Sequence, residues 1–306
     1  MSLLVTKAQG QAIVVDRGRQ HAQREGLSQG GPMDEYSYLW ANRLLGNPQQ
    51  AAMLEITLGN LQFVATHNTT LAITGGTMPV QCNGVPMEPW RRFAVAAGDV
   101  INVGFYQGRG TRLYLAMLGG IQAPLFYASR SCVLREQLGG HAQGRAVQAG
   151  DTLHSQLQQQ LAPQWVPTTL RKLPLPTQNI RFIPSYQYTA FPSSSHTTFT
   201  QAPYQLSPTM DRMGFRLQGA ALTVPQEELR SEGIALGSIQ VNRDGQPMVL
   251  MSDRQSIGGY AKLGVVYRVD LGLLAQMAPG QQVQFVQGNL EEAWHLQQQR
   301  EQFFAT

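Results

Sequence analysis

Short apolar runs recur from one end of this chain to the other and limit the folds open to it. The runs are rich in Val, Ile, Leu and Phe, are bounded by Gly, Pro, Asn or Asp, and are too short for helices. Many short strands joined by glycine-rich turns predict a mainly β protein built from barrels or sandwiches. The clearest runs are Gln11–Val15, Leu61–Val64, Leu71–Thr74, Val100–Phe105, Arg112–Met117, Pro247–Met251, Val265–Val269 and Val283–Val286.

A few short helices are expected among the strands. Each would begin at an Asp or Asn, whose side chain can accept hydrogen bonds from the first helical turn. Glycine after the last turn, or a Glu three residues after the cap, strengthens the prediction. The expected helices are 35–45 with Asp34 as cap and Gly46 as stop, a short helix from Asp270 to Pro279-Gly280, and a terminal helix with Asn289 and Glu292 as a capping box.

The composition changes between Ser155 and Gln178, where Gln and Pro become frequent and no hydrophobic periodicity persists. Such a segment is typical of a connector. A chain of 306 residues can hold two domains that each bury a core. We therefore expect two tandem β-barrel or sandwich domains, comprising residues 1–170 and 171–306.

The overall composition excludes several classes of protein. Apolar residues make up 42 % of the chain and charged residues 14 %, which is too apolar for a disordered chain. No segment approaches the roughly 20 consecutive apolar residues that a membrane helix requires, and the first residues lack a signal-peptide core. The sequence predicts a cytoplasmic protein without a membrane segment.

The basic residues argue against a nucleic-acid partner. The net charge is +4, but the arginines are scattered and form no basic run with interleaved aromatic residues. Nearly all basic residues are Arg, since the lysines are only Lys7, Lys172 and Lys262. Arginine is favoured where a planar fork must bind a carboxylate or phosphate.

Several catalytic motifs are imitated without being complete. Gly26-Leu27-Ser28-Gln29-Gly30 matches a nucleophile elbow, but no apolar strand precedes it, so a glycine-rich loop is the better interpretation. Gly139–Arg145 resembles a phosphate-binding loop that lacks the required lysine and hydroxyl, so an ATP site in this chain alone is not expected. No histidine pair has metal-ligand spacing, and no lysine lies in a Met-Lys-Met acceptor for biotin. We expect neither a metal nor covalent biotin.

Two polar segments remain as candidate sites. Gln29–Asp34 places flexible backbone amides at the start of the expected helix, which is a natural position for an anion. Asp253–Tyr260 follows an apolar strand and combines a carboxylate, a guanidinium, an amide and a phenol around Gly258-Gly259. The second set suits a small polar ligand that carries amide and carboxylate groups.

At these residues the chain resembles the allophanate hydrolase subunit 2 superfamily, which includes the C subunit of bacterial 5-oxoprolinase and KipA-like regulators. The resemblance lies in many short blocks in a fixed order along nearly the whole chain. They include Gly30-Gly31-Pro32-Met33-Asp34, Ala41-Asn42, Leu54-Glu55-Ile56-Thr57, Ser129-Arg130-Ser131, Asp211-Arg212-Met213-Gly214, Arg216-Leu217, Gly237-Ser238-Ile239-Gln240-Val241, Asp253-Arg254-Gln255 and Gly258-Gly259-Tyr260.

The resemblance implies a cyclophilin-like barrel in the C-terminal half and two partners, a B-type (allophanate hydrolase subunit 1-like) and an A-type subunit. It implies ATP-dependent opening of 5-oxoproline to glutamate by the complex, with the ATP site outside this chain alone. Arg212 and Arg216 would hold a carboxylate or a phosphoryl-like anion. Asp253, Gln255 and Tyr260 would orient the amide. Glu55 or Asp34 would assist proton transfer. The implied catalytic residues are Asp34, Glu55 and Asp253, and the implied substrate-binding residues are Asn42, Arg130, Arg212, Arg216, Gln240, Gln255, Gly258, Gly259 and Tyr260.

Two other functions of the superfamily remain open from the sequence. One is a biotin-dependent carboxyltransferase subunit that acts on urea, which is also a small planar amide. The other is a KipA-like regulator that binds a partner protein and performs no catalysis.

Overall fold

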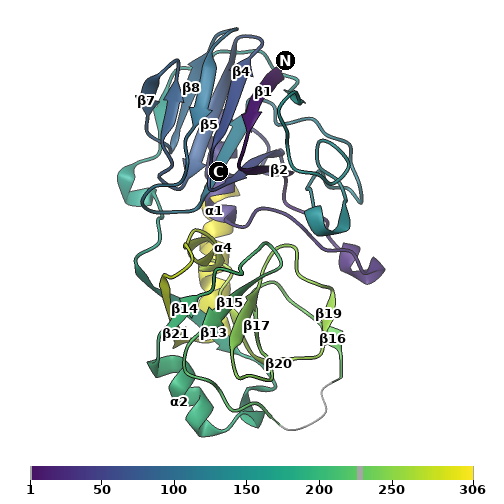
Figure 1. Ribbon diagram of the computed structural model, residues 1–306, viewed down its shortest axis with the longest axis vertical. Helices are drawn as coiled ribbons and strands as arrows, with labels where there is room; N and C mark the ends of the chain where they lie inside the picture. The colour runs from purple at the N-terminus through teal and green to yellow at the C-terminus, as the bar shows by residue number, and fades with distance from the viewer. Residues whose placement is uncertain (1, 226–229, 306) are drawn as a thin grey trace. The chain divides into compact units, whose positions relative to one another are not determined.

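The N-terminal strands form two six-stranded sheets in the computed structural model, which describes residues 2–225 and 230–305 (Figure 1). Neighbouring strands within both sheets are antiparallel. The first sheet has the order β11 (Thr152–His154), β1 (Ser2–Ala8), β4 (Leu61–Ala65), β9 (Val100–Val103), β6 (Val80–Cys82) and β7 (Val85–Met87). The second has the order β12 (Gln164–Trp165), β8 (Arg91–Val95), β5 (Thr69–Gly75), β10 (Arg112–Met117), β3 (Met53–Thr57) and β2 (Gln11–Val15).

The two sheets share one apolar core, as in a sandwich. Alternate residues of each strand point to opposite faces, so every second side chain enters this core. Val5 and Phe63 come from the first sheet, and Ile56 and Leu113 from the second. The opposite face of the second sheet, at β5, β8 and β10, is covered by helix α1 (Glu35–Leu45).

Helix α1 confirms the prediction from its sequence. The Asp34 carboxylate accepts hydrogen bonds from the backbone N–H groups of Tyr36 and Ser37, at 3.1 and 3.2 Å. Gly46 ends the helix in the left-handed region, with φ of +66°. The cap and the stop therefore fix both ends of the helix at the expected residues.

The chain divides into two compact units by its internal contacts. One contains Met1–His21 and Gly30–Leu173, and the other contains Ala22–Gln29 and Pro174–Thr306. The connector has more structure than its sequence indicated, because β12 and the 3-10 helix η3 (Thr168–Leu170) lie in it. The other 3-10 helices are η1 (Ala22–Glu25), η2 (Leu134–Glu136) and η4 (Tyr188–Ala190).

The second unit is built around a closed barrel of seven strands. Its order is β13 (Thr177–Pro184), β20 (Ala261–Val266), β17 (Ser238–Val241), β18 (Pro247–Leu250), β15 (Gly214–Gln218), β14 (Tyr204–Leu206) and β21 (Gln282–Gln287). A parallel pair, β13 and β21, closes it. A separate ribbon pairs β16 (Glu232–Gly233) with β19 (Ile257–Gly258). The predicted mainly β fold with a barrel in the C-terminal half is confirmed.

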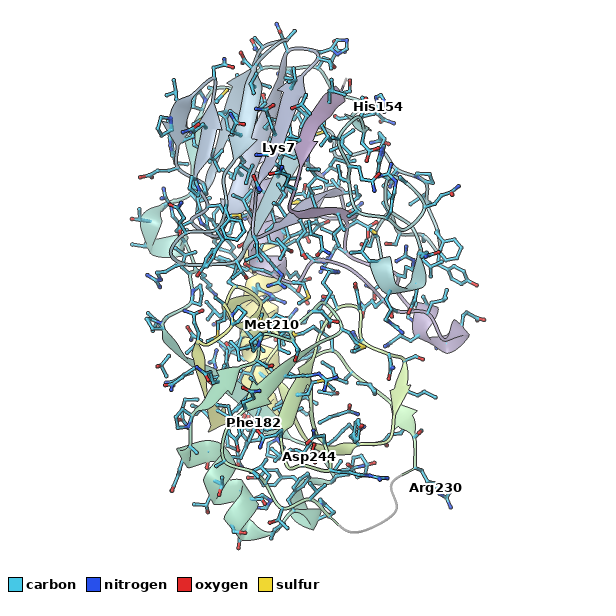
Figure 2. All side chains as sticks on the ribbon, in the orientation of Figure 1. Lys7, His154, Phe182, Met210, Arg230 and Asp244 are labelled. Carbon is cyan, nitrogen blue, oxygen red and sulfur yellow. The ribbon has the colours of Figure 1, made fainter. Side chains whose placement is uncertain are left out.

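Aromatic rings from the barrel strands and from one helix pack against one another. Phe182 on β13 (labelled in Figure 2) meets Phe199 at 5.2 Å between ring centroids, and Phe199 stacks on Phe285 at 4.4 Å. Phe199 belongs to helix α2 (Ser193–Gln201), which the sequence did not predict. The helix is rich in Ser and Thr, which are poor helix formers, so packing of Phe199 rather than propensity explains it.

Of the last two helices, the first departs from its expected cap and the second has the expected one. Helix α3 (Leu271–Ala275) is shorter than predicted, and Asp270 does not cap it because its carboxylate binds Arg181 at 2.7 and 2.9 Å. Helix α4 (Leu290–Ala305) is capped as expected by Asn289, which accepts the N–H of Glu292 at 2.8 Å. Within the described residues, none of these helices has the length and apolar character needed to cross a membrane.

Candidate functional site

The residues implied as a site fall in both compact units. The first unit contains Asp34, Asn42, Glu55 and Arg130, and the second contains Arg212, Arg216, Gln240, Asp253, Gln255, Gly258, Gly259 and Tyr260. Most of the implied residues thus belong to the unit that contains the barrel.

Asp34 and Glu55 belong to one buried network beneath helix α1. The Tyr114 hydroxyl donates to the Glu55 carboxylate at 2.7 Å and accepts the backbone N–H of Asp34, also at 2.7 Å. Glu55 accepts a further bond from the N–H of Met33 at 2.8 Å. Because Glu55 on β3 and Tyr114 on β10 are register partners, they lie on the same face of the sheet.

Burial keeps the Tyr114 phenol of this network protonated. The pKa of Tyr114 is raised well above its usual value, first because the phenol is buried and second because the Glu55 carboxylate lies beside it. The phenol therefore remains a hydrogen-bond donor at neutral pH. These contacts attach the start of α1 to the sheet, and both predicted carboxylates already have partners.

Asn42 and Arg130 are also held by polar contacts within the first unit. The Asn42 amide donates to the carbonyl of Ala51 at 3.0 Å. The backbone N–H of Arg130 donates to the Asp16 carboxylate at 2.5 Å. Within residues 2–225 and 230–305, no hydrogen-bond partner is found for the buried Nε of Arg130.

Asp16, which sequence reasoning missed, anchors this segment. Its Oδ1 atom accepts hydrogen bonds from the hydroxyls of Ser129 and Ser131, at 2.6 and 2.7 Å, and from the N–H of Gly18 at 2.9 Å. The sequence feature that could have identified Asp16 is its position directly after the strand-forming run Gln11–Val15. Asp16 thereby positions the backbone that carries Arg130.

Arg212 and Asp253 form a buried two-point salt bridge in the second unit. Nε and one terminal nitrogen of Arg212 each donate to a different oxygen of Asp253, both at 2.9 Å. Both residues are buried, and the N–H of Asp253 also donates to the Arg212 carbonyl at 2.8 Å. This geometry is the strongest form of Arg–carboxylate pairing. It joins the segment after β18 to the segment before β15.

Arg254, next to this pair, is buried and fixed by other contacts. Its Nε donates to the carbonyl of Ile234 at 3.0 Å, and a terminal nitrogen donates to the side chain of Gln29 at 3.3 Å. Burial, together with the nearby Arg268 guanidinium, lowers the pKa of Arg254 to about 10. The guanidinium therefore stays charged at neutral pH.

Ser28 anchors the segment Ala22–Gln29 to the same region of the second unit. Its hydroxyl donates to the carbonyls of Asp253 and Arg254, at 3.2 and 3.1 Å, and the side chain is buried. No strand precedes Ser28, since η1 lies there instead. The serine supports the loop structurally and lacks the strand–turn–helix setting of a hydrolase nucleophile.

A row of four side chains crosses the outer face of the barrel. The strand register pairs Arg216 with Met248, Met248 with Gln240, and Gln240 with Lys262. Directly paired residues share a face. The neighbours Phe215, Ile239 and Val249 are buried and point to the interior, so the row points outward. Sequence reasoning named Arg216 and Gln240 and missed the other two.

Gln240 is the buried polar side chain of this row. It is only 3 % exposed, and its amide nitrogen has no hydrogen-bond partner in the described part of the chain. Gly258 of β19 lies beside it, because a Cβ on that glycine would be 3.0 Å from the amide nitrogen. Gln255, Gly259 and Tyr260 are exposed.

The arginine of the glycine-rich loop in the first unit is paired with a carboxylate. Arg145, the only strong cation of the loop, makes a two-point salt bridge to Asp151 at 2.7 and 2.6 Å. The guanidinium is thereby occupied, and the loop supplies neither a lysine nor a hydroxyl for phosphate and magnesium. Among residues 2–225 and 230–305, three or more metal-ligating side chains do not gather at any point.

Comparison with known proteins identifies one family and several similar proteins. Residues 25–287 match the family described as carboxyltransferase domain, subdomain A and B. The chain is 34 % identical over 305 residues to the C subunit of 5-oxoprolinase from Escherichia coli, with 99 % of this chain and 96 % of that protein covered. It is 33 % identical over 304 residues to the corresponding C subunit from Haemophilus influenzae, with 97 % and 94 % covered.

A solved structure extends the similarity to the fold. The chain superposes on Kluyveromyces lactis urea carboxylase with a TM-score of 0.91 and 27 % identity, covering 99 % of this chain and 29 % of that protein. The family match and the matches to both 5-oxoprolinase C subunits extend over most of the chain, across both compact units. The chain is therefore a member of the carboxyltransferase domain, subdomain A and B family.

Proposed function

We propose that this chain is a subunit of an ATP-dependent 5-oxoprolinase complex, which hydrolyses 5-oxo-L-proline to L-glutamate together with an A-type and a B-type subunit. The observation that carries the proposal is identity of 33–34 % to two proteins named as C subunits of 5-oxoprolinase, over nearly the full length of both sequences. The reaction adds the hydroxyl of water to the lactam carbonyl carbon and a proton to the ring nitrogen as the C–N bond breaks. ATP supplies the driving force in the complex.

The contribution of this chain is to bind and orient the small amide. The outer face of the barrel presents a cation, an amide and nearby exposed polar groups, which suit a ligand with one carboxylate and one lactam. The buried Arg212–Asp253 pair holds the adjoining segment in place. Asp34 and Glu55 remain candidates for proton transfer, although their contacts with Tyr114 also give them a structural role.

The proposal is tested by reconstitution with and without this chain. The full-length chain is co-expressed with its A-type and B-type partners, and glutamate and ADP are measured after addition of 5-oxoproline and ATP. We expect glutamate release from the full set and none when this chain is omitted. A full complex that releases no glutamate would refute the proposal.

A carboxyltransferase is the second candidate, supported by the family description and by the superposition on K. lactis urea carboxylase. In that function the chain would work with a biotin-carrying protein to transfer a carboxyl group to a urea-like amide. It predicts that the partners include a biotinylated polypeptide and that labelled bicarbonate is fixed onto urea when ATP is present. Avidin should block that fixation and leave glutamate release by a 5-oxoprolinase unaffected.

A further inference from the structure

The outer row of the barrel has a cation at each end, and the two cations differ in their partners. Lys262 is bound to Glu232 at 2.6 Å, so its charge is neutralised. Arg216 is exposed, and none of the described residues makes an ion pair or a side-chain hydrogen bond with it. Among the described residues, Arg216 is thus the cation of the row without a paired carboxylate. A guanidinium fork matches a carboxylate in two-point geometry.

The buried amide of Gln240 needs an acceptor. Buried polar groups in folded proteins are nearly always hydrogen-bonded, and an exception calls for a specific explanation. In the described part of the chain the Gln240 nitrogen has no partner, although the side chain is more than nine-tenths buried. A carbonyl oxygen of a small ligand would satisfy it.

The spacing between the Arg216 guanidinium and the Gln240 amide fits one small ring. Arg216 and Gln240 are on strands separated by β18, which places their Cα atoms about 10 Å apart at ordinary strand spacing. Met248 lies between them on the same face, and its side chain packs over Gly214, where a Cβ would be 3.3 Å from the thioether sulfur. The row thus offers a cation, an apolar floor and an amide donor in a line.

The ribbon of β16 and β19 covers the Gln240 end of the row. Gly258 and Ile234 lie at the amide, since a Cβ on Gly258 would be 2.5 Å from Cδ1 of Ile234 and 3.0 Å from the Gln240 nitrogen. The ribbon has only two residue pairs, and a two-stranded ribbon is marginal by itself. Glu232 pairs with Lys262 at 2.6 Å, and the buried Arg254 donates to the Ile234 carbonyl at 3.0 Å, so the backbone of the ribbon is held in place. A ligand therefore reaches the amide by displacing the Ile234 side chain.

We infer that the row Arg216–Met248–Gln240 is the binding site for a lactam that carries a carboxylate, with Arg216 holding the carboxylate and Gln240 donating to the lactam carbonyl. This inference rests on the proposed function and specifies how the chain distinguishes its substrate class. Urea has the carbonyl but lacks the carboxylate, so Arg216 would select against it. The β16–β19 ribbon lies over the bound ring and shields it from water.

The test measures binding of two ligands to the full-length chain in complex with its co-expressed partners, without ATP. The ligands are 5-oxoproline and 2-pyrrolidinone, which is the same ring without the carboxylate, and saturation-transfer NMR titration gives the affinities. Arg216→Gln should weaken 5-oxoproline roughly 10- to 100-fold, as expected for loss of a charge-assisted bond. It should leave 2-pyrrolidinone unchanged, whereas Gln240→Met should weaken both ligands. Arg243→Gln, which changes an exposed arginine in a turn, is the matched control.

Each outcome decides the inference. Unchanged binding of 5-oxoproline to Arg216→Gln, equal losses for both ligands in that variant, or no effect of Gln240→Met would overturn it. Failure of the wild-type complex to bind either lactam would also overturn it. A wild-type complex that binds both ligands in the expected pattern but releases no glutamate with ATP would uphold the binding site and refute the proposed function.

Discussion

Replacing Gln240 with methionine should stabilise the second unit while it impairs ligand binding. The side chain is almost fully buried, and its amide nitrogen has no partner among the described residues. Leaving a buried polar group unsatisfied costs about 1–3 kcal/mol. Methionine has similar length and no group that requires a hydrogen bond, and it would pack against Ile234 and Gly258. The free energy of unfolding should therefore rise by about this amount.

The expected change in melting temperature follows from the size of the unit. For domains of about 150 residues, close to the size of the second unit, 1 kcal/mol corresponds to roughly 4 °C, so Gln240→Met should raise the Tm by roughly 4–12 °C. Differential scanning calorimetry of the full-length chain measures the change. Gln255→Met is the matched control because Gln255 is exposed, and a surface change of this kind is expected to alter stability by less than about 0.5 kcal/mol.

Stability and binding together decide whether the reasoning holds. A higher Tm with weaker lactam binding means that the amide is retained for binding at the expense of stability. An unchanged or lower Tm would show that Gln240 is already satisfied in solution, and the case for a ligand acceptor would fail.

Three further changes test other parts of the structure. Arg212→Ala should lower the free energy of unfolding by about 3–5 kcal/mol because it leaves the Asp253 carboxylate buried without its partner. Replacing both residues with leucine should lower the free energy of unfolding by less. Urea denaturation measures both changes. Tyr114→Phe should cost about 1–3 kcal/mol at pH 7. The pKa of Tyr114 is raised in the folded state, so its protonated phenol contributes its full stabilisation below about pH 10. Above about pH 10 the unfolded chain loses the phenol proton first, and this stabilisation falls. Between about pH 10 and 11 the free energy of unfolding should therefore fall less for Tyr114→Phe than for the wild type. Gly258→Ala should lower the Tm by about 2–4 °C because the added Cβ would press on Ile234. Gly233→Ala should leave the Tm unchanged because no atom lies within 4 Å of the added Cβ. An equal effect of the two variants would contradict the described packing of the ribbon.

Local sequence signals predicted the parts of the fold that depend on neighbouring residues. The cap at Asp34 and the glycine at Gly46 fixed the ends of α1, and the alternating apolar runs located most long strands. Helix α2 was missed because its Ser and Thr residues have low helix propensity and its helical structure depends on packing of Phe199 in the barrel. Asp270 failed as a predicted cap because a distant partner, Arg181, binds its carboxylate.

The candidate site was less predictable because its geometry depends on residues far apart in the chain. The sequence drew attention to Arg212 and Asp253, but a salt bridge across 41 positions becomes visible only when both strands are placed. The row that joins Arg216, Met248 and Gln240 depends on strand register, which no local pattern specifies. Sequence motifs therefore identified residues of interest, and the structure showed which of them face one another.

A single reaction mixture distinguishes the two candidate functions most sharply. The purified complex receives 5-oxoproline, urea, labelled bicarbonate and ATP together, and glutamate and fixed carbon are quantified from the same sample. We expect glutamate to form in step with ADP, no label to reach urea, and no glutamate to appear when this chain is left out. Label on urea without glutamate, or glutamate formed equally well in the absence of this chain, would contradict the proposed function.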